Sequence, residues 1–208
     1  MTDYDAYLDR ARVVKAQREP KPPDRTPDPP PYKPAVPFRW PASGLALQGF
    51  ACLHEVIHHF NGGRDIFLRN CFADSLRTFN DVFYGIDHRY GRPVLGTQED
   101  GTLELADTHV GLAFRLALQP GHVELLDGRD QVSVAYVPQV TSIRGDGVRI
   151  IEQANLFEIS SVYLGAMTTT HGVIVEKKNT RSLQEDAKHG FACESAAVGF
   201  MRKLRRLQ

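Results

Sequence analysis

From Gly44 onward, hydrophobic residues occur in short runs that glycine, aspartate and asparagine interrupt. Many runs are rich in β-branched or aromatic residues, and pairs such as Asp100-Gly101 and Asp127-Gly128 predict turns between them. The runs are Leu45 to Ile57, Phe83 to Ile86, Thr102 to Leu105, Leu112 to Leu118, Gln131 to Val137, Val148 to Ile151, Phe157 to Leu164 and Val173 to Val175. Turn signals every dozen or so residues favour a β-barrel or sandwich over a doubly wound α/β sheet.

Two segments have helical rather than strand-like spacing. The stretch from Phe67 to Phe79 places its apolar side chains on one side, which predicts a helix inside the domain. The stretch from Ser182 to Gln208 also has helical spacing and ends in several arginines and a lysine. Cations suit a helix C-terminus, so this tail is interpreted as a helix with a solvated basic face.

Proline separates the start of the chain from the domain. Ten of the 13 prolines lie between Pro20 and Pro41, and all 17 glycines follow residue 40. A proline-dense stretch favours extended polyproline II, which predicts a semi-rigid arm over residues 20–41. Before it, apolar residues at helical spacing indicate either a short amphipathic helix or a disordered tail. We therefore expect three parts: an arm at 1–41, a domain at 42–180 and a helical tail at 181–208.

Composition narrows the classes of function. The 25 basic and 25 acidic side chains cancel, so no global field attracts nucleic acid, and we expect no specific nucleic-acid partner. Three cysteines, Cys52, Cys71 and Cys193, match no disulfide framework or paired zinc motif and suggest a reducing compartment. No apolar run has membrane-spanning length, and the first residues lack the features of a signal peptide. We expect a cytoplasmic protein without a membrane partner.

The segment His54-Glu55-Val56-Ile57-His58 spells HExxH, a motif that binds zinc when it lies on a helix. Gly62-Gly63 follows closely and leaves little room for such a helix. The alternation of residues around the motif also allows a strand, on which the glutamate points away from both histidines. The strand is the favoured interpretation, and a zinc metalloprotease using His54, Glu55 and His58 is a third hypothesis for function.

Three other residues suit nucleophilic catalysis. His88 lies at the end of a predicted strand, Ser133 lies within a β-rich run, and Glu158 is an acid embedded in another such run. A serine hydroxyl is a poor nucleophile until a base takes its proton, and the imidazole needs an acid to fix its tautomer. Taken singly, each has an ordinary structural alternative, because a strand serine usually only bonds backbone.

The order of short motifs resembles the prohead maturation proteases of tailed phages, over residues 48 to 167. The family has an opening strand, a short helix, a strand that ends in His before a turn, a strand with a nucleophilic Ser, and a Leu-x-Glu-Ile-Ser strand. The matching residues are Gly49-Phe50-Ala51, Asp65-Ile66-Phe67, Phe72-Ala73-Asp74-Ser75-Leu76, His88 with Pro93-Val94-Leu95-Gly96, Asp100-Gly101-Thr102-Leu103, Gly111-Leu112, Val132-Ser133-Val134 and Leu156-Phe157-Glu158-Ile159-Ser160.

This resemblance implies a β-rich α+β fold: a closed or partly closed β-barrel with flanking helices, like that of the herpesvirus assemblins. It implies that His88 is the base, Ser133 the nucleophile and Glu158 the orienting acid, with no metal or cofactor. The implied partners are the major capsid protein with its scaffolding segment, and the protease itself, inside the immature prohead of the host cell. The chain departs from the family at Ala135, where a glycine is common.

A second hypothesis is a non-catalytic scaffold or assembly protein with the same barrel. The joint presence of His88, Ser133 and Glu158 argues against it, and Ala135 argues mildly for it, because a methyl group there can hinder close backbone approach.

Overall fold

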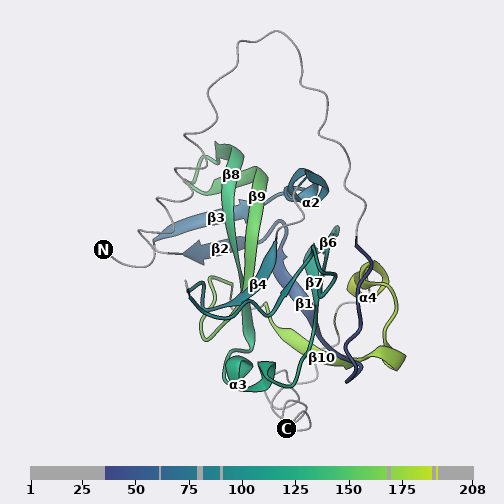
Figure 1. Cartoon of the computed structure of the whole chain (residues 1–208). Helices are drawn as coiled ribbons and strands as arrows, with labels where there is room; N and C mark the ends of the chain where they lie inside the picture. The colour runs from purple at the N-terminus through teal and green to yellow at the C-terminus, as the bar shows by residue number, and fades with distance from the viewer. Residues whose placement is uncertain are drawn as a thin grey trace.

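The structure is a computed structural model that describes residues 36–60, 62–78, 82–89, 91–167, 170–188 and 191. Within these residues the strands form two sheets (Figure 1). The first has the order β10-β1-β7-β6 and is antiparallel throughout. Its strands are β1 (Leu45–Leu53), β6 (Leu103–Asp107), β7 (Gly111–Ala117) and β10 (Gly172–Glu176).

The second sheet is organised around one long strand, β9 (Arg149–Val162). Strand β8 (Gln131–Ile143) pairs with it antiparallel along almost its whole length, so the two form the long ribbon in Figure 1. Strands β3 (Gly63–Phe67) and β4 (Phe83–Ile86) pair with β9 in parallel at its beginning and towards its end. The outer strands are β2 (Ile57–Phe60) beside β3 and β5 (Gly96–Thr97) beside β4. The parallel pairing with β4 positions the site described below.

The helices of the described residues are few and short. They are α2 (Ala73–Thr78), α3 (His122–Leu126), the 3₁₀ turn η1 (Lys177–Asn179) and α4 (Leu183–Lys188). The predicted helix from Phe67 to Phe79 is wrong in its first part, because Phe67 ends strand β3 and the helix begins only at Ala73. The predicted C-terminal helix is represented by α4, and residues 192–208 lie outside the described part of the chain.

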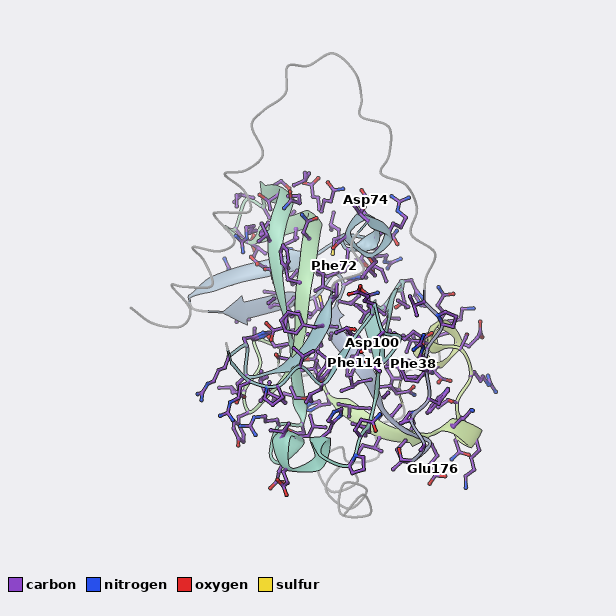
Figure 2. The ribbon with its side chains drawn as sticks, in the orientation of Figure 1. Phe38, Phe72, Asp74, Asp100, Phe114 and Glu176 are labelled. Carbon is purple, nitrogen blue, oxygen red and sulfur yellow. The ribbon has the colours of Figure 1, made fainter. Side chains whose placement is uncertain are left out.

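The hydrophobic core lies between the two sheets. Tyr84 of β4 and Phe114 of β7, the latter labelled in Figure 2, are fully buried, with ring centroids 5.4 Å apart. The expected β-rich α+β class is thus confirmed. In the described residues, however, the strand pairing does not close into a barrel. An isolated bridge between Gln131 and His171 links the start of β8 to the segment before β10.

A β-bulge interrupts β9 at Phe157. Leu156 and Glu158 pair with consecutive residues of β8, so Phe157 between them has no partner. Side chains alternate along a regular strand, so Leu156 and Glu158 would otherwise point to the same face. The bulge breaks this alternation and lets both Leu156 and Ile159 enter the core. Glu158 therefore lies on the face of the sheet opposite the core.

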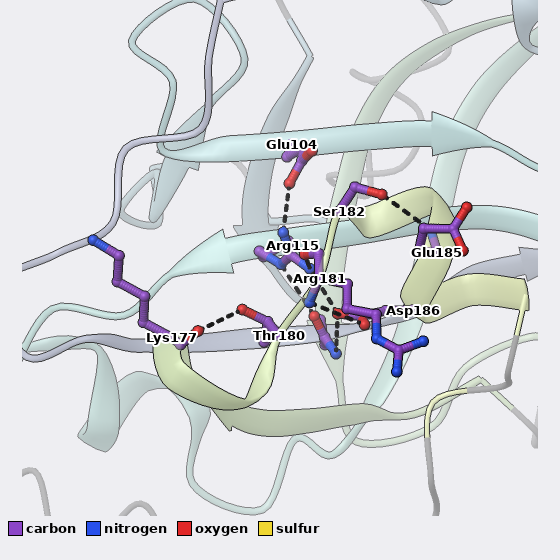
Figure 3. A network of polar contacts seen from close by, with 9 residues as sticks. Glu104, Arg115, Lys177, Thr180, Arg181, Ser182, Glu185 and Asp186 are labelled. Carbon is purple, nitrogen blue, oxygen red and sulfur yellow. Dashed lines mark hydrogen bonds and ion pairs between the residues drawn. The ribbon is translucent and has the colours of Figure 1, made fainter.

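Arg115 of β7 is the centre of a polar network that joins the first sheet to α4 (Figure 3). Its guanidinium donates to Glu104 of β6 at 3.0 Å and to Asp186 of α4 at 2.9 Å. It also donates to the side-chain oxygen of Gln48 and to the carbonyl of Arg181, both at 3.1 Å. Arg115 is buried, and a buried guanidinium is stable only when its charge is paired. The network therefore fixes α4 against β6 and β7.

The segment before β1 covers the same arginine. Phe38 and Trp40 contact each other edge to face, and their ring centroids lie 5.7 and 5.5 Å from the Arg115 guanidinium. Residues 36–41 form neither helix nor strand. The rest of the predicted arm, with its candidate amphipathic helix, lies outside the described residues, so the arm as a whole stays a prediction.

Replacing Arg115 with alanine is expected to lower the free energy of unfolding by about 3–5 kcal/mol, because Glu104 and Asp186 lose their charge partner. Chemical denaturation measures the loss. Arg69→Ala is the matched control. It removes an arginine that is exposed, as is its ion-pair partner Glu55, and exposed ion pairs add little stability. Equal stability of the Arg115 variant and the wild type would contradict this role.

Candidate active site

Glu158 is a nearly buried acid on the outer face of β9, where the bulge turns it away from the core. Glu158 is 7% exposed, so its carboxylate needs hydrogen-bond donors from the protein. One donor is the hydroxyl of Ser160, which bonds Glu158 Oε1. Ser160 lies two residues further along the same strand and hence on the same face. The strand itself thus supplies one of the groups that fix this carboxylate.

His88 lies in a tight turn directly after β4. Its Nδ1 is 3.3 Å from Glu158 Oε1, so the structure brings these two predicted residues together. Both Asp87 and His88 have positive φ, 56° and 52°, a left-handed conformation that non-glycine residues seldom adopt. Such strained backbone is common at functional sites, where surrounding contacts maintain it. The turn redirects the chain so that the imidazole lies over the face that carries Glu158.

Contacts around Asp87 hold this left-handed turn. The Arg129 guanidinium donates to Asp87 Oδ2 at 2.9 Å, and the Asp87 amide donates to the carbonyl of Ser161 at 2.9 Å. Arg129 is covered in turn by the ring of Tyr163, whose centroid lies 4.1 Å from the guanidinium. An ion pair shielded from water in this way is stronger than an exposed one. The turn that carries His88 is therefore anchored to both β9 and the segment before β8.

Ser133 lies on β8, directly opposite Ser160 of β9. Directly opposite residues of antiparallel strands point to the same face, with Cβ atoms about 4.5–5.5 Å apart. Ser133 therefore shares the outer face with Ser160 and Glu158, while its neighbour Val132 is buried in the core. In the described part of the chain the Ser133 hydroxyl makes no hydrogen bond to His88. Nucleophile–base hydrogen bonds are often long without substrate, so the predicted Ser133–His88 contact stays a prediction.

Two further residues of the site were not predicted as functional. The Ser160 hydroxyl accepts a hydrogen bond from the backbone amide of His88 at 3.3 Å and donates one to the carboxylate of Glu158. Gly85 of β4 lies opposite Ser160, and a Cβ at this position would come within 2.7 Å of Glu158 Oε1. The motif Leu-x-Glu-Ile-Ser contains Ser160, but its role depends on the register between β4 and β9, which short motifs do not reveal. Gly85 leaves the space that the carboxylate occupies.

Ala135, the departure from the family pattern, lies on β8 opposite Glu158. Its methyl group therefore lies on the same face of the sheet as Glu158. The contact between Glu158 and His88 is present together with this methyl group.

The HExxH segment does not form a helix. Strand β1 ends at Leu53, a turn follows, and β2 begins at Ile57, so the two histidines belong to different elements. The single strand favoured from the alternation is also interrupted, since Glu55 has a positive φ of 58°. The helical arrangement that the zinc hypothesis requires is therefore absent.

Both histidines of this segment are buried and face protein groups. His54 Nε2 lies 3.2 Å from Asp107 Oδ1, and His58 Nε2 lies 2.9 Å from the carbonyl oxygen of Leu53. Burial lowers the pKa of His54 to about 4, so its ring is neutral near pH 7, and burial raises the pKa of Asp107 to about 6. The described residues contain no group of three or more His, Cys, Asp or Glu side chains that could hold a metal ion.

Comparison with known proteins identifies a family whose match spans the β-rich domain. A family model described as caudovirus prohead serine protease matches residues 41–186. The match includes every described strand and the beginning of α4. A comparison with curated proteins gives no match. Within the described residues, no helix has the length and apolar character that crossing a membrane requires.

Proposed function

The chain belongs to the caudovirus prohead serine protease family, and from this premise we propose that it is a serine endopeptidase with His88, Ser133 and Glu158 as its catalytic residues. The observation that supports the proposal is that the three side chains lie on the same side of the second sheet. His88 Nδ1 lies 3.3 Å from Glu158, and Ser133 stands opposite Ser160, which bonds Glu158. A base, an orienting acid and a hydroxyl on adjacent strands are the parts that acyl transfer requires.

The arrangement suggests a role for each nitrogen of the imidazole. Nδ1 faces Glu158, which leaves Nε2 to accept the proton of Ser133. The Ser133 oxygen attacks the peptide carbonyl, and His88 then gives the proton to the leaving amine, which leaves an acyl-enzyme. A water molecule, deprotonated by the same nitrogen, hydrolyses the ester and restores the serine. Glu158 stabilises the imidazolium that forms in each half of the reaction.

We propose the scaffolding segment of the major capsid protein as the substrate, together with the protease itself. Membership of the prohead protease family supports this choice and a reaction inside the immature shell. In this proposal the two sheets are the halves of a partly closed, assemblin-like barrel, with the bridge between Gln131 and His171 at one seam. We also place the end of the catalytic domain after α4 rather than at residue 180, because Asp186 is bonded to Arg115.

Labelling with a fluorophosphonate probe tests the proposed chemistry without knowledge of the cleavage site. We expect one probe per chain, with mass spectrometry locating it on the peptide that contains Ser133. A chelator should leave the labelling rate unchanged, because no metal takes part. A properly folded chain that does not react would favour the non-catalytic assembly protein. Proteolysis that chelators stop and the probe does not would favour a metalloprotease.

A further inference from the structure

Ser160 connects the acid and the base of the proposed site through a single hydroxyl. Its Oγ donates to Glu158 Oε1 and accepts the backbone amide of His88 at 3.3 Å. The side chain is fully buried, and its proton is committed to the carboxylate, so it is unsuited to attack a substrate. Its two bonds link the side chain of the acid to the main chain of the base.

The contact between His88 and Glu158 does not fix the imidazole by itself. Although His88 Nδ1 is 3.3 Å from Glu158 Oε1, it has no aligned hydrogen-bond partner among the described residues. The backbone of His88 is also in the left-handed region, with φ of 52°. Both facts mean that the base depends on other contacts for its position. The bond from its backbone amide to Ser160 is such a contact, and it joins the strained turn directly to β9.

The surroundings of Ser160 leave room for this arrangement. The residue opposite it on β4 is Gly85, where a Cβ would come within 3.0 Å of Ser160 Oγ and 2.7 Å of Glu158 Oε1. On its other side, the residue opposite Ser160 on β8 is Ser133. The hydroxyl thus lies between the strand that carries the nucleophile and the strand that leads to the base.

We propose that Ser160 is a positioning residue that holds Glu158 and His88 in register with Ser133, a role that rests on the proposed serine protease mechanism. Its hydroxyl directs Glu158 Oε1 towards the imidazole and fastens the left-handed turn that carries His88. Loss of the hydroxyl should slow the chemical step, because a small misplacement of reacting groups lowers the rate considerably. The affinity for the substrate or probe should stay unchanged, because the buried Ser160 does not contact it.

The neighbouring residue, Ser161, provides a matched control. It is also fully buried on β9, but its side chain points into the core and bonds the hydroxyl of Tyr84 at 2.8 Å. Ser160→Ala and Ser161→Ala therefore delete the same atom from adjacent buried positions on opposite faces. Both should lower thermal stability, and only the first should slow the reaction. Ser160→Cys nearly preserves the side-chain volume, but its thiol is only a weak hydrogen-bond donor. This variant therefore separates the effect of the hydrogen bonds from the effect of packing.

The test measures inactivation by a fluorophosphonate probe, with the limiting rate kinact and the binding constant KI determined separately. For Ser160→Ala we expect kinact to fall by about 10- to 100-fold with KI unchanged. Ser160→Cys should be nearly as slow, and Ser161→Ala should keep the wild-type kinact. Wild-type kinact in Ser160→Ala, or full recovery in Ser160→Cys, would overturn the positioning role. If instead Ser133→Ala reacts as fast as the wild type, the proposed function fails, and this outcome does not depend on Ser160.

Discussion

Ser133→Ala is expected to reduce proteolysis by up to about 10⁶-fold, because the variant lacks the only atom proposed to attack the peptide carbonyl. His88→Ala should cost nearly as much, since the serine hydroxyl is a weak nucleophile without a base. The two residues act as one unit, so the double variant should be scarcely slower than either single variant. Neither side chain belongs to the hydrophobic core, so both variants should fold.

The measurement is co-expression with the cognate major capsid protein, followed on a gel by loss of its scaffolding segment. Ser142→Ala is the matched control, because it deletes a serine hydroxyl from the same strand, β8, at its exposed end. It should process the capsid protein as the wild type does. His54→Ala and His58→Ala should retain turnover per folded molecule. If Ser133→Ala still processes capsid protein while His54→Ala does not, the serine mechanism is wrong.

Glu158→Gln is expected to lower turnover by about 10³- to 10⁴-fold, less than loss of the nucleophile or the base, by analogy with other triads. The glutamine fills the same space beside Gly85, so the fold should persist. It removes the negative charge that stabilises the imidazolium, and its amide group can face Nδ1 and favour the wrong tautomer of His88.

Turnover and thermal stability measured together check this expectation. Glu152→Gln is the matched control, because Glu152 lies on the same strand but is exposed and bonds only Ser142 among the described residues. It should alter neither quantity. Wild-type turnover in Glu158→Gln would show that the carboxylate near His88 is structural and would remove the acid from the proposed mechanism.

Most strands could be predicted from local pattern, and the errors occur where tertiary pairing overrides it. The spacing from Phe67 onward is helical, yet Phe67 pairs with Ile151 of β9 and belongs to a strand. The two apolar runs at Val148 to Ile151 and Phe157 to Leu164 both contribute to one strand, β9. They look separate because the polar residues between them, Glu152 among them, include side chains that face solvent.

An ordered set of motifs predicted the three site residues, and the pairing of β4 with β9 explains why two of them, His88 and Glu158, lie close together. Parallel pairing of Gly85 with Ser160 brings the end of β4, and hence His88, to Glu158. Parallel neighbours cannot be derived from hydrophobic alternation, because buried strands in either orientation show similar runs. For this reason the role of Ser160 in the site could not be predicted from the sequence.

The bulge at Phe157 gives the chain different tolerances to substitution and to change of length. A substitution at 157 alters one half-buried side chain, and deletion of Phe157 would leave Leu156 and Glu158 adjacent and still on opposite faces. Deletion of Ile159 would instead make Glu158 and Ser160 adjacent and force one of them from the outer face to the core face. Residues added at the exposed hairpin tip, 144–147, would leave Glu158 in place, because its position is set by pairing with Phe83 of β4. During evolution, insertions and deletions should therefore accumulate at the tip, while the spacing from Glu158 to Ser160 stays constant.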